Sequence, residues 1–452
     1  MEAKQNQEVV VIMVPFPLQS HLNQLLQLSS QISSYNIPVH YLSSDIHRRQ
    51  ATSRAAATAY TRIHFHNIPL PPFVCPPPNP NSPNKFPVHL QPALLASLEL
   101  REPVAAYLRR MAGEFKRVVV VHDTMMAYVV EDVSSIPNAE SYSYNAISAL
   151  AMACFIRPLP EQLSSMGLPV LEDELPEEIS YITCLQFKHL SCRDGDLYNT
   201  SRLIEAPYLD ILENVQEAKI RKSWAIGPIL PPQISSSETH QFHKCLEWLD
   251  KQEGKSVIYV AFGSTTTLSD EEVTELAFGL ERSRVKFLWV LRDADRGDVF
   301  DGDVRRADLP EGFEERVEGV GMVVRDWAPQ LQILAHRSVG GFMSHCGWNS
   351  CVESISMGVP MAAWAMHSEQ PVNSVLVTEV LKLGIAVREW KNKMELVKAS
   401  VIEDVVRRLM ASEEGDEMRR RAAEVGAELR RTTEAGGASR LELDSFVAHI
   451  TR

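Results

Sequence analysis

Polar and aromatic side chains crowd one stretch of the sequence, which runs from Trp327 to Gln370. An indole opens this stretch, and the pair Glu369-Gln370 closes it. Between the two ends, groups that donate or accept hydrogen bonds surround one turn: His345, Asn349, Ser350 and Glu353. A flat ring, hydroxyl-binding carboxylates and phosphate-binding donors are the groups that the parts of a nucleotide sugar need. The spacing therefore predicts a nucleotide-sugar site here.

A strand-to-helix turn must position the middle of this stretch. Residues 340–344 have the pattern of a strand end, and residues 350–357 that of a helix stopped by Gly358 and Pro360. Ligands of open parallel sheets bind beyond the carboxyl ends of the strands, and a helix N-terminus favours phosphate. Because the sequence contains no glycine-rich phosphate loop, side chains and helix amides would have to supply the donors.

These residues also have ordinary structural interpretations. Ser350 and Glu353 have the spacing of a capping box, which would satisfy the start of a helix without any ligand. Trp327 taken alone is more typical of a core residue, and the pair Glu369-Gln370 of a solvated loop. The presence of all these residues within one short stretch favours the ligand site.

A second candidate pair lies far upstream. His21 follows the apolar run 9–14 at the start of an expected helix, and Asp123 comes just after the apolar run 118–121. Both would lie at the carboxyl edge of one parallel sheet. Such a pair suits general-base catalysis, because the carboxylate orients the imidazole and stabilises its charged form. A purely structural histidine is the alternative for His21, and His122 should point to the opposite face of its strand.

Apolar runs occur in two successive sets and predict an α/β protein with two parallel sheets. The first set is 9–14, 39–42, 118–121 and 141–144, and the second is 257–262, 287–291, 322–324, 340–343, 360–364 and 385–387. We expect Rossmann-like domains at residues 1–232 and 243–435, joined by a linker at 233–242 and facing a central cleft. A final helix within 436–452 has an apolar stripe for packing back toward the N-terminal domain. The proline-rich segment 70–84 should be a surface loop or lid.

Composition excludes several classes of protein. The 452 residues carry a net charge of −13, which argues against nucleic acid or an anionic membrane as the main partner. The seven cysteines are scattered and form no CxxC pair, which favours reduced thiols in the cytoplasm over disulfides or a zinc site. No signal sequence and no apolar run of about 18–20 residues is present. We expect a cytoplasmic monomer, without membrane anchor, that acts on small molecules.

The stretch 327–370, with its tryptophan, its polar strand-to-helix turn and its final Glu369-Gln370 pair, resembles the signature box of the plant UDP-dependent glycosyltransferases. The GT-B fold of that family has two facing Rossmann-like domains. We call this stretch the donor box. The resemblance implies a UDP-sugar as donor, inversion at the anomeric carbon, and no metal or other cofactor. The donor-binding residues that it implies are Trp327 and Ala328 for uracil, Gln330 and Glu353 for ribose, His345, Asn349 and Ser350 for the diphosphate, Trp348, Glu369 and Gln370 for the sugar, and Gly263, Ser264 and Thr265 near the phosphates.

The same resemblance makes His21 the catalytic base and Asp123 its partner. It implies an N-terminal acceptor-binding domain and a C-terminal donor-binding domain. Residues expected near the acceptor or the sugar are Ser20, Asn23 and Asn145. Ser20 stands where the family usually has glycine, Ala365 where it has proline, and Glu369 where it more often has aspartate.

Segments along nearly the whole chain are similar to the zeatin O-glucosyl- and O-xylosyltransferase subfamily, which acts on side-chain hydroxyls of cytokinins. They include PFPLQSHLNQLLQLS, IPVHYLSSDIHRRQ and YNTSRLIEAPYLDILE. We therefore expect transfer of glucose or xylose to a zeatin-type acceptor, with terpenoids, flavonoids or their glycosides as the alternative acceptors. A non-catalytic nucleotide-sugar-binding protein and a nicotinamide-dependent oxidoreductase are competing interpretations. The His21–Asp123 pair disfavours the first, and the missing GxGxxG motif disfavours the second.

Overall fold

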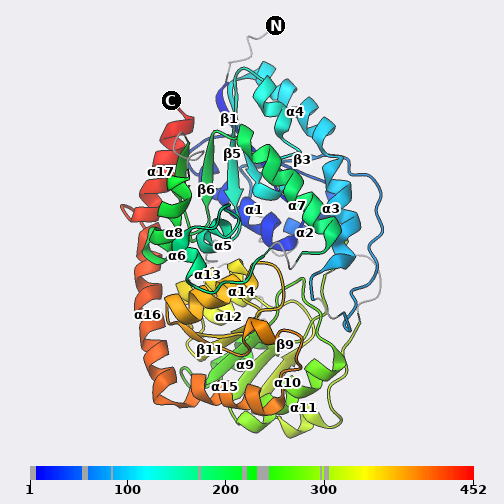
Figure 1. The fold of residues 1–452 in the computed structure, drawn as a ribbon, viewed down its shortest axis with the longest axis vertical. Helices are drawn as coiled ribbons and strands as arrows, with labels where there is room; N and C mark the ends of the chain where they lie inside the picture. Colours follow the sequence, from blue (N-terminus) through cyan, green and yellow to red (C-terminus); the bar gives the residue numbers. More distant parts are fainter. Residues whose placement is uncertain are drawn as a thin grey trace.

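Two parallel β-sheets, each covered by helices, form the protein (Figure 1). The computed structural model describes residues 7–52, 60–82, 85–171, 175–215, 221–231, 244–295, 298–299 and 305–452. The predicted linker at 233–242 lies outside these residues. The GT-B arrangement expected from the sequence is confirmed, because the two sheets follow one another along the chain and every strand pair within them is parallel.

The N-terminal sheet has seven strands in the order β3-β2-β1-β4-β5-β6-β7. Their bounds are β1 Gln7–Val14, β2 Val39–Ser43, β3 Ile63–Asn67, β4 Phe115–Asp123, β5 Ala139–Asn145, β6 Gly195–Tyr198 and β7 Lys222–Ala225. The central strands β1 and β4 are the longest apolar runs, because helices cover both of their faces. Strands β3, β6 and β7 were not predicted, because they are short and rich in polar or charged residues.

The C-terminal sheet has six strands in the order β10-β9-β8-β11-β12-β13. Their bounds are β8 Val257–Ala261, β9 Lys286–Val290, β10 Gly321–Val324, β11 Val339–Ser344, β12 Met361–Ala363 and β13 Gly384–Ala386. All six were predicted. The central strands β8 and β11 are buried along their whole length, as expected of a sheet between two helical layers.

Helices and short turns connect the strands. Those of the N-terminal half are α1 Gln19–Ser33, α2 Asp45–Thr52, α3 Gln91–Leu98, α4 Arg101–Glu114, α5 Ala149–Ala153, α6 Glu161–Ser164, α7 Glu177–His189 and α8 Arg202–Asn214. Those of the C-terminal half are α9 Lys244–Asp250, α10 Asp270–Ser283, α11 Phe313–Arg316, α12 Gln330–Leu334, α13 Trp348–Met357, α14 Gln370–Val375, α15 Ala399–Ala411, α16 Glu413–Thr433 and α17 Ala438–Ile450.

The last two helices return the chain to its N-terminal half. The long α16 contacts α13, and α17 then packs beside β7 (red in Figure 1). The apolar stripe of α17 lies in the same core cluster as β1 and β4, and Trp224 of β7 donates a hydrogen bond to Ser445, with Nε1 and Oγ 3.3 Å apart. A chain segment far from the N-terminal sheet in sequence thus completes one face of its core.

The described part of the proline-rich segment contains neither helix nor strand between residues 70 and 82. Its residues are exposed or half-buried. No helix within the described ranges combines the length and the apolar character that a membrane span needs.

Candidate active site

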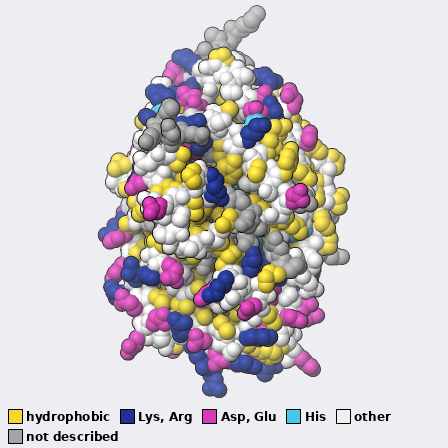
Figure 2. Space-filling view, in the orientation of Figure 1, with side chains coloured by type: hydrophobic (Ala, Val, Ile, Leu, Met, Phe, Trp, Pro, Cys, Tyr) yellow, Lys and Arg dark blue, Asp and Glu magenta, His cyan; other side chains and the backbone are white. Residues whose placement is uncertain are grey.

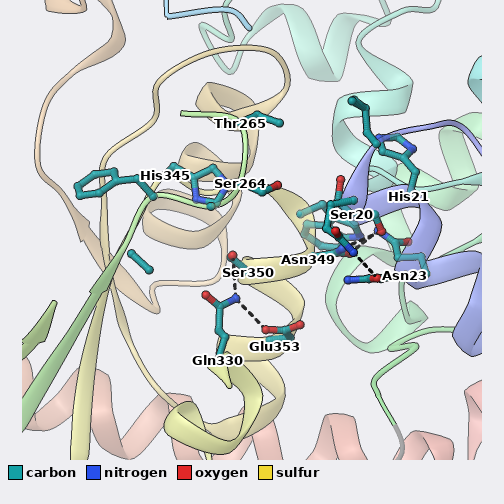
Figure 3. Close-up of a pocket in the computed structure, with 18 of the residues that line it drawn as sticks. Ser20, His21, Asn23, Ser264, Thr265, Gln330, His345, Asn349, Ser350 and Glu353 are labelled. Atoms are coloured by element: carbon teal, nitrogen blue, oxygen red, sulfur yellow. Dashed lines mark hydrogen bonds between the residues drawn. The ribbon is translucent and has the colours of Figure 1, made fainter. Parts of the chain in front are cut away.

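A cavity of about 1140 Å³ lies where the carboxyl ends of both sheets meet. Its walls come from both halves of the chain, including the segment after β1, the end of β4, the turn after β8 and the turn after β11. Figure 3 shows Ser20, His21 and Asn23 on one side of the view and Ser264, His345 and Gln330 on the other, with Asn349 beside Ser20. Figure 2 shows acidic and basic side chains interspersed over the face of the molecule that it presents.

His21 and Asp123 form a hydrogen-bonded pair in this cavity. Asp123 is the last residue of β4 and its side chain is 1% exposed, while His21 lies in the first turn of α1. Nδ1 of His21 lies 2.7 Å from Oδ2 of Asp123, and the backbone N–H of Met125 donates to Oδ1 over 2.9 Å. The carboxylate is therefore fixed at both oxygens, and Nε2 lies on the side of the imidazole away from it.

Electrostatics favour proton uptake by His21. Burial alone would lower its pKa, but the negative charge and the hydrogen bond of Asp123 raise the pKa above its ordinary value, with help from Glu369. The neighbouring His122 behaves differently, because burial lowers its pKa to about 4 and its ring bonds to the backbone carbonyl of Asp123. Only His21 of these two histidines lines the cavity.

The donor box begins at the wall of the cavity. Trp327 lines the cavity with 40% of its surface exposed, so the alternative interpretation as a core residue is wrong. Ala328, the next residue, lines the same cavity and is buried. An exposed indole above a cavity is a surface on which a flat ring can stack.

The capping-box interpretation of Ser350 and Glu353 is also wrong. Helix α13 begins at Trp348 with Gly347 at its N-cap, so Ser350 already lies inside the first turn. Instead, the side-chain amide of Gln330 donates to Ser350 Oγ over 3.1 Å and to Glu353 Oε2 over 2.8 Å (Figure 3). Burial raises the pKa of Glu353 to about 7, against the opposing effect of the Gln330 hydrogen bond.

His345 lies between two glycines that leave room for its ring. A Cβ atom at Gly263 or Gly347 would come within 2.5 or 2.6 Å of His345 Nε2, and Gly263 also has a positive φ of 74°. Burial lowers the pKa of His345 to about 4, so the ring is neutral at pH 7. It can therefore offer an N–H to an anion without carrying a charge. No local pattern indicated the role of Gly347, which is explained by this close approach of the His345 ring.

Trp348 and Asn349 reach across to the N-terminal half. Trp348 Nε1 donates to the backbone carbonyl of Asn199 over 2.8 Å. Asn349 Nδ2 donates to the carbonyl of Ser20 over 3.2 Å, and Gln24 donates to Asn349 Oδ1. The start of α13 is thus bound directly to the segment that carries His21.

Gln370 is not a solvated loop residue. It is 3% exposed, and its Oε1 accepts hydrogen bonds from the backbone N–H groups of Met366 and His367, each over 3.0 Å. Glu369 lines the cavity beside it. Burial raises the pKa of Glu369, while its own backbone, His21 and the backbone of Trp348 act in the opposite direction.

The remaining predicted residues divide into two groups. Ser20, Asn23, Ser264 and Thr265 line the cavity, and Thr265 Oγ1 lies 3.3 Å from Nε2 of His367. Asn145 does not line it: the side chain is buried, accepting from Thr124 Oγ1 over 2.9 Å and donating to the carbonyl of Leu197 over 3.2 Å. The expected position of Asn145 beside acceptor or sugar is therefore corrected, because its amide joins β5 to its neighbours.

A segment missed by sequence reasoning spans the cavity from the N-terminal half. Lys85 Nζ lies 2.7 Å from Oε2 of Glu272 at the start of α10, and both side chains are largely buried. His89 Nε2 lies 2.9 Å from the carbonyl of Asp295. Phe86, between these two contacts, lines the cavity and meets the ring of His367 edge-on. A lysine that directly follows a proline-rich stretch carries no signal of such a contact.

Apolar side chains line the part of the cavity on the N-terminal side. They come from α5, α7 and the loops beside them: Met125, Ile147, Met152, Phe155, Leu175, Ile179 and Phe187. We call this set the apolar lobe. Among the described residues, no three His, Cys, Asp or Glu side chains form a group that could hold a metal ion.

Comparison with known proteins identifies the family of the chain. Residues 7–231 match the model of the glycosyltransferase N-terminal domain, and residues 200–407 match that of the UDP-glucoronosyl and UDP-glucosyl transferase family. The chain is 51% identical to zeatin O-xylosyltransferase of Phaseolus vulgaris over 98% of both chains. It is 50% identical to zeatin O-glucosyltransferase of Phaseolus lunatus, over 98% of this chain and 97% of the relative.

Solved structures have the same fold. A UGT transferase from Siraitia grosvenorii in complex with UDP matches with a TM-score of 0.79 and 26% identity, over 98% of this chain and all of that one. UGT2 of Phytolacca americana, complexed with UDP-2fluoro-glucose and pterostilbene, matches with a TM-score of 0.77 and 25% identity, over the same shares of the two chains. The chain described here belongs to the family of UDP-dependent glycosyltransferases.

Proposed function

We propose that this enzyme transfers glucose or xylose from its UDP-sugar to a side-chain hydroxyl of a zeatin-type cytokinin. The observation that carries the proposal is the His21–Asp123 pair, which faces the donor box across one cavity. The similarity to zeatin O-xylosyl- and O-glucosyltransferases over nearly the whole chain supports the acceptor class. The two sugars stay open, because these two relatives differ in the sugar they transfer and match this chain about equally.

In the proposed reaction, His21 Nε2 takes the proton of the acceptor hydroxyl while Asp123 holds Nδ1. The acceptor oxygen forms a bond to the anomeric carbon as the bond from that carbon to the β-phosphate oxygen of UDP breaks. The electron pair of the broken bond leaves with UDP. A single displacement inverts the anomeric carbon, so an α-linked UDP-sugar gives a β-linked product. His21 is then protonated, and the charge of Asp123 stabilises it.

The donor box would hold the leaving group. Trp327 would stack on uracil, Glu353 would accept hydrogen bonds from the two ribose hydroxyls, and the neutral ring of His345 would donate to the diphosphate. The N-terminus of α13 adds positive potential where charge develops on the leaving UDP. Among the remaining residues of the box, Ala328 and Gln330 belong to the nucleoside end, Asn349 and Ser350 to the phosphates, and Trp348, Glu369 and Gln370 to the sugar.

The apolar lobe would take the acceptor. Its side chains match a small, largely apolar molecule and lie next to His21, so a hydroxyl at the end of that molecule can reach the base. Phe86 adds an aromatic wall from the segment that spans the cavity. The same lobe could admit other apolar plant metabolites, and only an activity screen separates them.

We propose that residues 1–232 form the acceptor-binding domain and residues 243–435 the donor-binding domain, with a linker at 233–242 and a C-terminal helix segment at 436–452. The two sheets, each with its own core, support this division. Closure of the site depends on contacts between the halves, such as those of Lys85 and Trp348.

We further propose that the enzyme acts in the cytoplasm as a monomer, on two small molecules, without a metal and without nucleic acid. Seven free cysteines and a net charge of −13 support a reducing compartment and small-molecule partners. Light scattering after size exclusion tests the monomer. Activity that survives exhaustive dialysis against EDTA tests the metal, and loss of activity restored by Mg²⁺ would contradict the proposal.

The decisive experiment is a donor-by-acceptor screen with mass detection. It crosses UDP-glucose and UDP-xylose with cis-zeatin, trans-zeatin, flavonoids and terpenoid glycosides. The proposal expects the highest kcat/KM for one of the zeatins. A flavonoid or terpenoid turned over more efficiently than both zeatins would overturn the acceptor assignment while leaving the enzyme class intact.

A further inference from the structure

Three side-chain amides form a continuous hydrogen-bonded relay between the two halves of the enzyme. The backbone N–H of Ile229 donates to Oδ1 of Asn199 over 2.8 Å. Nδ2 of Asn199 donates to Oε1 of Gln24 over 2.8 Å. Nε2 of Gln24 donates to Oδ1 of Asn349, and Nδ2 of Asn349 donates to the backbone carbonyl of Ser20 over 3.2 Å. The relay ends on the residue that precedes His21.

The direction of every hydrogen bond in this relay is fixed by its ends. An amide N–H can only donate and a backbone carbonyl can only accept, so Ile229 and Ser20 leave one orientation for each amide between them. Two further contacts of Gln24 agree with that orientation: Tyr144 donates its hydroxyl to Oε1 over 2.7 Å, and Nε2 donates to the carbonyl of Ala146 over 3.2 Å.

Because the relay is buried, a mispaired amide within it would cost free energy. Gln24 is 2% exposed and Asn199 is 1% exposed, and both amides of this pair have partners on oxygen and nitrogen. A reversed amide would place oxygen against oxygen and nitrogen against nitrogen at several contacts at once. Because the groups are buried, water could not replace the lost hydrogen bonds. The orientation of Asn349 is therefore set from the N-terminal half.

This orientation matters because Asn349 lines the cavity at the start of α13 (Figure 3). Its carbonyl oxygen is engaged by Gln24, which leaves the NH₂ group as the part of the side chain that can serve a ligand. One hydrogen of that group goes to Ser20, and the second has no acceptor among the described residues. A diphosphate needs a donor there, because a carbonyl oxygen in the same place would repel it.

We propose that Gln24, supported by Asn199, is a positioning residue that holds Asn349 with its NH₂ group toward the diphosphate of the donor. This inference rests on the proposed function. It adds a residue of the acceptor-side helix α1 to the determinants of donor binding. Donor recognition thereby depends on both halves being in contact.

The test substitutes Gln24→Glu, which keeps the shape of the side chain and removes its N–H donors. A carboxylate at this position cannot donate to Asn349 Oδ1 and repels it, so the asparagine amide is displaced from the orientation that Gln24 and Ser20 hold together. The affinity for UDP-glucose, measured by isothermal titration calorimetry, should fall roughly 10- to 100-fold, the range for hydrogen bonds to charged groups. The inhibition constant of uridine, which has no phosphate, should not change.

Three further variants make the result specific. Gln31→Glu adds the same charge on α1 at a position that does not line the cavity, and it should leave UDP-glucose affinity unchanged. Gln24→Met removes the relay without adding charge and should weaken UDP-glucose several-fold, which keeps the test open if Gln24→Glu fails to fold. In an Asn349→Ala background, Gln24→Glu should add no further loss, because both act through one contact.

Melting temperatures of all variants are measured in parallel. Unchanged UDP-glucose affinity in both folded Gln24 variants would overturn the inference, and so would equal losses for UDP-glucose and uridine. Wild-type enzyme that does not bind UDP-glucose would instead overturn the proposed function. The two failures are therefore distinguishable.

Discussion

Nδ1 of His21 lies 2.7 Å from Oδ2 of Asp123, and this contact joins the start of α1 to the end of β4 at the floor of a cavity shared by both halves of the enzyme. Asp123 is the last residue of the central strand β4, and His21 lies in the first turn of the helix that follows the central strand β1, so the middle of the sheet positions the pair. The chemistry assigned to it depends on this fixed geometry, because a base must meet the acceptor hydroxyl at hydrogen-bond distance.

Substitution of His21 should separate catalysis from donor binding. His21→Ala is expected to lower kcat by roughly 10²- to 10⁴-fold, the usual contribution of a general base, while the dissociation constant of UDP-glucose stays nearly unchanged. His64→Ala, at an exposed histidine of β3, is the matched control and should leave both quantities alone. An equal loss of turnover and UDP-glucose affinity would remove His21 from the role of base.

Glu369 should influence the pH profile through His21. A general base acts in its neutral form, so kcat/KM falls as pH drops through the pKa of His21, which lies above its ordinary value. Glu369 contributes to that elevation, and Glu369→Gln should therefore move the acidic limb of the profile to lower pH. The substitution can also lower kcat/KM at every pH, because the sugar loses its contact with Glu369. The pH at which the acidic limb lies is therefore the quantity to compare. A limb that stays in place would show that the two groups are not coupled.

Glu353 should make nucleoside binding depend on pH near neutrality. Its pKa of about 7 means that the carboxyl is protonated at lower pH, and a protonated carboxyl cannot accept from both ribose hydroxyls. Affinity for uridine is therefore expected to rise as pH increases through about 7. Uridine is the ligand to use, because it has no phosphate to titrate in the same range. Glu353→Gln should flatten the dependence, and a persistent slope in that variant would assign it to another group.

Trp327 should contribute stacking energy to UDP binding. Trp327→Ala is expected to weaken UDP by roughly 1–3 kcal/mol, the scale of base–aromatic stacking. Titration calorimetry measures the change directly. Trp390→Ala, at a tryptophan that is neither buried nor part of the cavity wall, serves as the control. UDP affinity that is the same in both variants would mean that the exposed indole has no ligand role.

Much of the fold follows from the sequence because the central strands are uninterrupted apolar runs. Residues 9–14 of β1 and 118–121 of β4, and the whole of β8 and β11, are uncharged and almost entirely buried, and few other structures suit such runs. Strand β6, with sequence GDLY, is too short and polar to be distinguished from a loop by pattern alone. It becomes a strand because it pairs with β5 and β7, which is information about distant parts of the chain.

In the site, too, residues marked by a local sequence pattern could be predicted, and residues defined by distant contacts could not. His21 and Asp123 could be predicted because each lies at or soon after the carboxyl end of a recognisable apolar strand. Asn145 was misplaced, although it also ends a strand, since its side chain hydrogen-bonds to Thr124 instead of facing the cavity. Gln24 lies on the expected helix α1, yet nothing local marks it, because its partners lie on three other segments of the chain.

Ser350 and Glu353 match a capping-box pattern in the sequence but do not cap the helix in the structure. Ser350 and Glu353 have the required spacing, but the turn at Gly347 starts the helix earlier than the pattern suggests. The ring of His345 leaves no room for a Cβ atom at Gly347, and this contact cannot be read from the local sequence pattern. Both side chains thereby become partners of Gln330 and face the cavity.

The configuration of the product tests the central claim most directly. Wild-type enzyme and His21→Ala are incubated with trans-zeatin and an α-linked UDP-sugar, once with UDP-glucose and once with UDP-xylose, and the products are analysed by mass spectrometry and proton NMR. We predict one added sugar, β-linked to the side-chain oxygen of zeatin, formed by the wild type and nearly absent with His21→Ala. An α-linked product, or sugar attached to a ring nitrogen, would contradict a single displacement driven by His21 at a hydroxyl.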